Sequence, residues 1–208
     1  VFDKFVNRIS ERVKDIKTGE DSSSDLGPMI MSTNSQKVMD HLKEVEDVCE
    51  IIKGKSDSKT MFIAPSIVVE PPEDARIVNE ETFGPVLSIR KFDNEEDLFL
   101  KIHKTGFGLS SSIFGKNKKR INFIVKNIKA GNVSINDVMS HYGIASLPFG
   151  GEGLSGVGRI HGKEGLRSLC RTKSIVVNRF NFINEPWWFG RPKIVEKVLE
   201  KVVNYLYI

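Results

Sequence analysis

The architecture follows from residues 86–136, which read VLSIRKFDNEEDLFLKIHKTGFGLSSSIFGKNKKRINFIVKNIKAGNVSIN. Short runs of β-branched residues alternate here with segments of helical period. Strands are expected over 86–92, 110–114 and 132–136, and helices over 98–102 and 118–128. Because a parallel connection must cross over, usually through a helix, this order predicts an α/β fold: a layered, largely parallel sheet with flanking helices.

The same mixture of elements extends toward the N-terminus. Phe2, Val6, Ile9 and Val13 recur at spacings of three and four, which predicts a helix over 2–16. A second helix is expected over 38–48, with Asn34 or Ser35 as its N-cap. A strand is expected over 61–69, which is rich in β-branched residues and is followed by two prolines.

Beyond residue 136 the sequence changes character. Residues 137–165 contain eight glycines, so the backbone there is suited to turns and close approach, and this region is the best candidate for a site. A last strand is expected over 173–178 and an amphipathic helix over 194–206. These patterns predict one domain over 1–180 and a C-terminal extension over 181–208.

Composition limits the class of protein. The 208 residues are 39% hydrophobic and 28% charged, which is enough to bury a core, and the net charge of +4 permits nucleic-acid binding without requiring it. Two cysteines are too few for a disulfide scaffold or a four-thiolate zinc site. Without an apolar run of membrane length or a signal peptide, a cytoplasmic protein without metal is expected. Because Val1 already lies in an expected helix, we expect a piece of a longer polypeptide.

A glycine pattern at 151–156 has the G-x-G-x-x-G spacing of dinucleotide-binding loops. That motif needs a strand before it and a helix after it. Residues 147–149 are not a convincing strand, and three glycines in 157–165 would break the helix. We therefore interpret 151–156 as a tight loop that packs under a pocket.

Two acidic residues and an aromatic precede the strand expected at residue 86. Neighbouring residues of an extended segment point to opposite sides, so Glu80 and Glu81 cannot act as an acid/base pair on one atom. One of them can face a cleft and accept hydrogen bonds from a diol such as that of a ribose, beside the flat apolar surface of Phe83. The alternative is that both acids are simply solvated.

Neither cysteine has the surroundings of a nucleophile. Cys49 lies near the end of an amphipathic helix, where a small buried side chain is expected, and Cys170 lacks a helix start or a neighbouring histidine. The histidines have no metal-ligand spacing. His141 lies in the glycine-rich region and is either a pocket residue or a surface histidine of the loop.

Two further features concern partners. The basic segment 116–120 opens a helix with an apolar inner face, so it is interpreted as a solvated face, and no nucleic-acid partner is expected. Trp187 and Trp188, with the last helix, are candidates for weak contact with a membrane surface or a partner subunit, and equally for core packing.

Four motifs in this order resemble those of the aldehyde dehydrogenase superfamily. They are EETFGPV at 80–86, GFGLSSSIF at 106–114, GNVSIN at 131–136, and PFGG at 148–151 with SGVGR at 155–159. The resemblance runs from about residue 1 to 178 and corresponds to the C-terminal catalytic half of that family. Residues 184–208 look like an extension found only in some members.

The resemblance implies roles for individual residues. Glu81 matches the glutamate that hydrogen-bonds the nicotinamide ribose of NAD or NADP, and Phe83 matches the aromatic that contacts the same end of the cofactor. The residues implied at the aldehyde tunnel and its mouth are Asn136, Asp137, Val138, Met139, His141, Tyr142 and Phe149. Their aromatic and apolar members favour an apolar aldehyde, while the choice between NAD and NADP stays open.

The resemblance also implies what these residues do not supply. The nucleophilic cysteine and the activating glutamate of the family precede the segment that matches 1–16, and neither Cys49 nor Cys170 is at the nucleophile's position, so no catalytic residue is assigned. The implied function is a portion of an NAD(P)-dependent aldehyde dehydrogenase that oxidises an aldehyde to a carboxylic acid through a cysteine thiohemiacetal and thioester. This chain alone is expected to be inactive, and its assembly a dimer or higher homo-oligomer. The alternative is a non-catalytic remnant that serves as a protein-interaction or oligomerisation domain.

Overall fold

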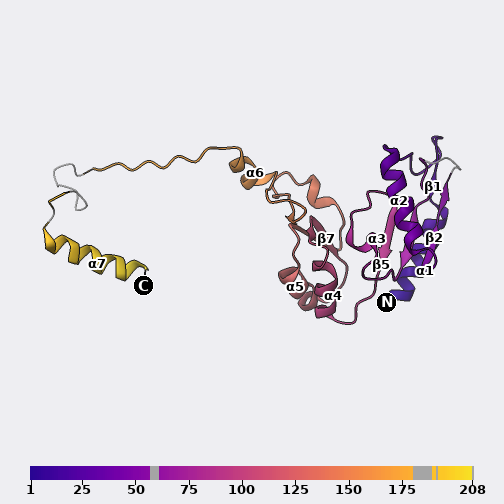
Figure 1. Ribbon diagram of the computed structural model, residues 1–208, viewed down its shortest axis with the longest axis horizontal. Coiled ribbons are helices and arrows are strands. Elements are labelled where there is room, and N and C mark those ends of the chain that lie inside the picture. The colour runs from indigo at the N-terminus through magenta and orange to yellow at the C-terminus, as the bar shows by residue number, and fades with distance from the viewer. Residues whose placement is uncertain (57–60, 180–188, 191, 208) are drawn as a thin grey trace. The chain divides into compact units, whose positions relative to one another are not determined.

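The computed structural model, drawn in Figure 1, describes residues 1–56, 61–179, 189–190 and 192–207. The chain divides into two compact units, 1–169 and 170–208. The expected end of the first domain at residue 180 stays a prediction.

The first unit holds most of the regular structure. Its helices are α1 (Phe2–Asp15), α2 (Ser32–Val45), α3 (Arg76–Asn79), α4 (Glu95–His103), α5 (Lys118–Asn127) and α6 (Gly162–Ser168), with a 3-10 turn, η1, at Ser140–Gly143. Its strands are β1 (Lys17–Thr18), β2 (Glu50–Lys53), β3 (Lys55–Ser56), β4 (Ser66–Val69), β5 (Val86–Ile89), β6 (Phe107–Gly108), β7 (Ser110–Ile113), β8 (Asn132–Ile135) and β9 (Glu152–Gly153). The second unit contains α7 (Lys193–Tyr207).

The main core is built on a three-stranded sheet in the order β2–β4–β5. The central strand β4 runs parallel to β5 and antiparallel to β2. Adjacent residues of a strand face opposite sides, so Ile67 and Val68 serve two separate clusters. Ile67 packs with Val6 of α1 and Ile89 of β5, while Val68 belongs to the cluster around α2.

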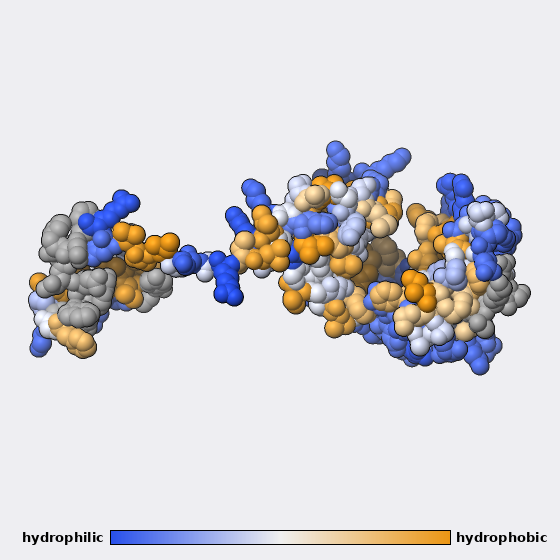
Figure 2. All heavy atoms as spheres, turned by 90° about the horizontal axis from the view of Figure 1, so that it is seen from above, coloured by the Kyte–Doolittle hydropathy of each residue, from blue (hydrophilic) through white to orange (hydrophobic). Residues whose placement is uncertain are grey.

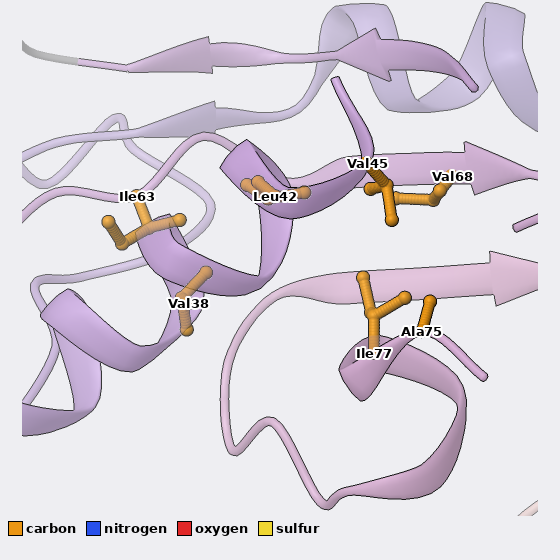
Figure 3. Packing of buried hydrophobic residues seen from close by; sticks show 7 residues of the cluster. All are labelled: Val38, Leu42, Val45, Ile63, Val68, Ala75 and Ile77. Atoms are coloured by element: carbon orange, nitrogen blue, oxygen red, sulfur yellow. The ribbon is translucent and has the colours of Figure 1, made fainter. Parts of the chain in front are cut away.

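Figure 3 shows this second cluster, in which helix α2 and the α3 region contribute side chains against β4. Its buried members are Val38, Leu42, Val45, Ile63, Val68, Ala75 and Ile77. Val38 and Val68 are completely buried, and Val45 is almost completely buried. The amphipathic period that predicted α2 therefore serves to fix this helix against the sheet, directly beside the chain that leads into β5.

A second, smaller sheet pairs β7 with β8 in parallel, joined by α5 as the crossover. Asn117 caps this helix by accepting from the Arg120 amide at 3.1 Å, and Asn94 caps α4 in the same way from the Asp97 amide at 3.0 Å. The caps explain why α4 begins at Glu95, earlier than its apolar residues indicated. The short strands β6 and β9 pair antiparallel, and β1 pairs parallel with β3.

The α/β class is confirmed, with helices and several small sheets. The alternation over 86–136 does not continue through one sheet, because β5 pairs with β4 whereas β7 pairs with β8. An alternation of strands and helices predicts that each strand has a parallel neighbour. One continuous sheet and two separate sheets both satisfy this condition, so the pattern does not distinguish between them.

Three local predictions are wrong. Only 66–69 of the strand predicted over 61–69 is a strand, and α2 begins at Ser32, so neither Asn34 nor Ser35 is its N-cap. Residues 173–178 form no strand, because no neighbouring strand pairs with them, and their apolar side chains are exposed. Helix α7 confirms the predicted last helix, whereas Trp187 and Trp188 lie outside the described residues.

On the face shown in Figure 2, the surface mixes hydrophilic and hydrophobic residues. Leu100 of α4 and Phe123 of α5 are exposed apolar side chains. Within the described ranges, no helix has the length and apolar character needed to cross a membrane. The same ranges contain no group of three or more His, Cys, Asp or Glu side chains placed to hold a metal ion.

Candidate functional site

The segment 80–85 joins α3 to β5 and carries both predicted cofactor residues. Glu81 and Phe83 are exposed, Phe83 to 68% of its surface. The backbone of Phe83 has a φ of 50°, a conformation that costs a residue with a side chain about 1–3 kcal/mol and persists only where the surroundings fix it. The segment therefore presents a carboxylate and an aromatic ring together on a backbone held in one shape.

Helix α2 supplies the contacts that hold this segment. Lys37 Nζ donates to the carbonyl oxygen of Glu81 at 2.7 Å and lies 3.4 Å from Glu80 Oε2. One turn further on, His41 Nδ1 is 3.1 Å from the hydroxyl oxygen of Thr82. Sequence reasoning did not identify this role for Lys37, His41 or Thr82.

His41 is fully buried, with 0% of its surface exposed. Burial lowers its pKa, and the positive charges of Arg76 and Lys37 lower it further against the opposing effect of Glu80, so the ring is neutral near pH 7. Its Nε2 lies 3.4 Å from Glu80 Oε2 and makes no regular hydrogen bond. A proton on Nε2, facing this carboxylate, leaves Nδ1 to accept from the Thr82 hydroxyl.

Glu80 and Glu81 point to different surroundings, as an extended backbone requires. Glu80 lies between α2 and Arg76, whose Nε is 3.4 Å from Glu80 Oε1. Desolvation opposes its ionisation, but Arg76 and Lys37 outweigh it and hold the pKa of Glu80 below its usual value. The Glu81 carboxylate makes none of the hydrogen bonds or ion pairs recorded for the described residues. It is the one that can accept hydrogen bonds from a ligand.

The second group of predicted residues begins at the end of β8. Asn136 has a φ of 54°, and its side chain accepts from the Gly115 amide at 2.8 Å and donates to the Gly115 carbonyl at 3.0 Å. Asn is the residue, besides Gly, that most readily adopts this backbone conformation. The pair of bonds fixes the end of β8 against the end of β7, at the point where the glycine-rich region starts.

Asp137 shapes the loop rather than facing an open site. Its carboxylate accepts from the Ser140 hydroxyl at 2.6 Å and from the Ser140 amide at 2.9 Å, and these hydrogen bonds lower the pKa of Asp137. The bonds start the 3-10 turn that carries His141 and Tyr142.

His141 connects this loop to the small sheet. Its Nδ1 lies 2.9 Å from the Ser134 hydroxyl of β8, and its Nε2 lies 3.2 Å from the Ser110 hydroxyl of β7. Its ring stacks on Phe149, with centroids 5.7 Å apart. The hypothesis that His141 is a surface histidine is therefore less consistent with the structure than a role in ordering the loop.

Aromatic rings gather around Phe149. Tyr142 meets it edge-on at a centroid distance of 5.0 Å, and His161 lies 5.8 Å from Tyr142. Phe149 is held by a pair of backbone hydrogen bonds with Ile160, each of 2.7 Å. His141, Tyr142 and Phe149 thus lie together as predicted neighbours, and His161 joins them as a residue that the sequence placed only in the same region.

The remaining predicted residues of the loop are open to solvent. Val138, Met139 and Tyr142 are all more than half exposed, with Met139 at 70%. These loop residues do not by themselves enclose a tunnel. None of the hydrogen bonds or ring contacts of the described residues joins this group to Glu81 or Phe83.

The glycine-rich segment that follows this loop is tightly packed. A β-carbon on Gly131 would overlap the carbonyl of Gly150, and Asn132 Nδ2 donates to the same Gly150 carbonyl at 2.9 Å. Arg159 Nη1 donates to the carbonyl of Gly151 at 2.8 Å. Residues 151–156 form β9 and a turn and do not open a helix, which agrees with their interpretation as a loop.

A sequence pattern could have pointed to the site residues that the sequence analysis missed. Lys37 and His41 stand one turn apart on α2, next to the buried Val38 and Leu42. Two polar residues beside the apolar face of a helix indicate a polar partner on the neighbouring element. Ser110 and Ser134, on two strands that pair in parallel, carry a weaker signal of the same kind.

Comparison with known proteins gives the family. The model of the aldehyde dehydrogenase family matches residues 1–175. The chain is 30% identical over 190 residues to aldehyde dehydrogenase [NAD(P)+] 1 of Saccharomyces cerevisiae, covering 86% of this chain and 37% of that protein. It is 34% identical over 181 residues to succinate-semialdehyde dehydrogenase [NADP(+)] 2 of Schizosaccharomyces pombe, covering 84% and 36%.

Solved structures agree with the sequences. The crystal structure of betaine aldehyde dehydrogenase from Staphylococcus aureus in complex with NAD+ matches with a TM-score of 0.78 and 30% identity, over 91% of this chain and 39% of that one. The chain thus spans about 37% of the length of the relatives it matches. Over most of its own length, the chain belongs to the aldehyde dehydrogenase family.

Proposed function

We propose that these 208 residues are the C-terminal catalytic-domain portion of an NAD(P)-dependent aldehyde dehydrogenase that oxidises an aldehyde to a carboxylic acid. The observation that carries the proposal is the loop at 80–85, which presents the Glu81 carboxylate and the Phe83 ring, both exposed, on a backbone that α2 holds through Lys37. The similarity to aldehyde dehydrogenase [NAD(P)+] 1 and to succinate-semialdehyde dehydrogenase [NADP(+)] 2 supports it.

The residues of this loop fit the ribose and nicotinamide end of such a cofactor. An exposed carboxylate accepts hydrogen bonds from a ribose diol, and an exposed ring offers a flat apolar surface to an aromatic ligand. When bound, NAD or NADP supplies the acceptor for a hydride from the substrate. Glu81 and Phe83 bind and orient that end of the cofactor.

The loop at 137–149 shapes the aldehyde entrance. Asn136 and Asp137 fix its first turn, His141 ties it to β7 and β8, and Phe149 anchors the ring cluster at its end. Val138, Met139 and Tyr142 then offer apolar surface at the rim, which favours an apolar aldehyde.

The oxidation further needs a thiolate nucleophile and a base that activates water. Cys49 is partly buried, burial raises the pKa of its thiol, and its Sγ lies 3.9 Å from the Glu70 carbonyl, so it lacks the surroundings of an activated thiolate. Cys170 is exposed in the second unit. We infer that the 208 residues alone do not oxidise aldehydes and that the complete polypeptide supplies the nucleophile.

The test begins with the complete reading frame that contains these residues, read from the transcript and expressed whole. Aldehyde and NAD or NADP are mixed with the protein in a single turnover, and NAD(P)H formation is followed by fluorescence. Glu81→Gln should slow this step about tenfold or more, because hydrogen bonds to a charged group contribute about 1.5–3 kcal/mol. Glu46→Gln, at an exposed glutamate next to α2, is the matched control. An unchanged rate in Glu81→Gln overturns the assignment.

We also propose that the protein self-associates, as a dimer or higher oligomer, with α7 as one contact. Several apolar side chains of this helix, such as Ile194, Val198 and Val202, are exposed in the chain by itself. Sedimentation of the complete protein should show an oligomer that Val198→Asp weakens. A monomer at micromolar concentration contradicts this part of the proposal. The cytoplasmic location stays a prediction from the sequence.

A further inference from the structure

We propose that the Lys37–His41 face of helix α2 is the positioning device for the cofactor segment: Lys37 holds the Glu81 carbonyl and His41 holds the Thr82 hydroxyl, and together they set where the Glu81 carboxylate and the Phe83 ring stand. This inference rests on the proposed function, which gives Glu81 and Phe83 their ligand. Lys37, His41 and Thr82 are then positioning residues, since they act through Glu81 and Phe83.

Residues 80 and 82 of the segment contact α2 through their side chains, whereas residues 81 and 83 do not. The Glu80 carboxylate and the Thr82 hydroxyl turn toward α2, where they approach Lys37 and His41. The side chains of Glu81 and Phe83 are exposed. Because alternate residues of an extended backbone face opposite sides, contacts that fix residues 80 and 82 on α2 direct Glu81 away from the helix. The positive φ of Phe83 then sets the direction in which its ring leaves the segment.

The backbone of the segment needs such support. Phe83 has a positive φ, and a residue with a side chain stays in that region only where its neighbours determine it. On one side of Phe83, Thr82 is bound to His41. On the other side, Gly84 lies against Val38, with no space for a β-carbon between them. Lys37, Val38 and His41 therefore contact the segment on both sides of the strained residue.

The surroundings of His41 keep its ring in one position against the segment. The ring is completely buried, so water does not compete with the Thr82 hydroxyl for Nδ1 in this arrangement. In its neutral form it offers Nδ1 as an acceptor and aims an Nε2 proton at Glu80, whose carboxylate Arg76 and Lys37 hold in place. Charge-assisted contacts of this kind hold the Glu80 side chain, and with it the start of the segment, against α2.

The first experiment uses the 208-residue chain and needs no catalytic activity. Backbone order parameters of residues 81–83, from 15N relaxation, report motion of the segment on the picosecond to nanosecond scale. Thr82→Val, which removes the hydroxyl and keeps the shape, and Lys37→Gln should each lower them. Lys43→Gln, at an exposed lysine on the same helix, should not. Unchanged order parameters in Thr82→Val and Lys37→Gln overturn the positioning role.

The second experiment measures cofactor binding by the complete polypeptide. Thr82→Val should raise the Kd and the KM for NAD or NADP about threefold to tenfold, which corresponds to the loss of one hydrogen bond, and leave the aldehyde KM unchanged. Thr82→Ser should restore the wild-type values, since it keeps the hydroxyl. Thr82→Val and Thr82→Ser also keep the test decisive if variants of the buried His41 fail to fold.

The outcomes separate the two proposals. If Glu81→Gln impairs NAD(P)H formation while Thr82→Val and Lys37→Gln match Lys43→Gln in cofactor Kd, the positioning inference is wrong and the proposed function stands. If Glu81→Gln has no effect, the proposed function is wrong, whatever the order parameters show. If Thr82→Val raises the aldehyde KM as much as the cofactor KM, the effect is general disorder and the inference is also overturned.

Discussion

Gly84 packs so closely against Val38 that a β-carbon on residue 84 would lie less than 3.0 Å from Val38 Cγ2. Val38 is fully buried in the cluster between α2 and β4, and Gly84 directly follows Phe83. The glycine is required here by close approach, since its φ is not among the positive ones.

Gly84→Ala should lower the free energy of unfolding by about 1–3 kcal/mol, because an added methyl group in a packed core forces its neighbours to shift. Val38→Ala opens space at the same point, so the double variant should be less destabilised than the two single variants summed. Urea denaturation measures all three. Gly27→Ala, where a β-carbon meets nothing within 4 Å, is the control. Simple additivity would show that the two residues do not compete for space.

Asn136 combines two contributions that substitutions can separate. Asn136→Ala loses both bonds to Gly115 and places a β-carbon at a φ of 54°, whereas Asn136→Gly loses the bonds and relieves the backbone. We expect Asn136→Ala to be the less stable of the two by about 1 kcal/mol, by thermal and chemical denaturation. Equal stabilities would mean that the backbone conformation costs nothing at this position.

The buried His41 predicts a dependence of stability on pH. Its pKa is lowered in the folded chain, so below its usual value of 6.5 the unfolded chain binds a proton that the folded chain resists. The free energy of unfolding should therefore be fully maintained above pH 6.5 and fall as the pH drops below it, by at most about 1.4 kcal/mol per pH unit for one proton. The charged groups facing the ring are Lys37 from α2, Arg76 from α3 and Glu80 from the segment before β5.

His41→Asn should flatten this dependence, since Asn keeps a polar group near the Thr82 hydroxyl and does not titrate. The quantity to compare is the difference between wild type and variant in urea denaturation between pH 7.5 and 5, because the other histidines then cancel. A wild-type advantage that grows on acidification would mean that Glu80 outweighs burial and the nearby positive charges.

The bond between His141 and Ser134 predicts the order of the entrance loop. Ser134→Ala leaves a ring nitrogen of His141 without its partner and should cost about 1 kcal/mol of unfolding free energy. Chymotrypsin should also cleave faster after Tyr142, which the loop carries in an exposed position. Ser146→Ala, at an exposed serine of the same loop, should cleave at the wild-type rate. Equal cleavage in both variants would show that Ser134 does not restrain the loop.

The helices α1, α2, α4, α5 and α7 were predicted from the sequence, because the apolar stripe of an amphipathic helix marks its own buried face. The short helices α3 and α6 were not predicted, and α6 begins at Gly162, where glycines were expected to prevent a helix. The stripe around Val6 on α1 and that around Val38 on α2 mark the faces that contact the sheet, and no distant information is needed to see them. Strand pairing is different. The sequence of β7 carries no sign that it pairs with β8 rather than with β5, because register and neighbour depend on surfaces formed elsewhere in the chain.

The candidate site divides in the same way. Glu81 and Phe83 could be chosen because their chemistry and the local motif agree, and the structure places both on one exposed loop. The contacts of Lys37 and His41 with this loop join residues more than 40 positions apart in the sequence. The sequence around either partner does not indicate which residue the other one is. Likewise the segment 173–178 has the composition of a strand, but composition cannot supply the partner that a strand requires.

The packing of α1 sets a constraint on synthesis. Val6, near the start of α1, completes its cluster only with Ile67 and Ile89, so its apolar face has no native partner until the ribosome has passed residue 89. At about 5–20 residues per second, that face waits for roughly 4–17 s. By contrast, β7, α5 and β8 lie close together in the sequence and can pair as soon as they emerge. The nascent chain should therefore engage chaperones through α1, and acquire its small sheet without them.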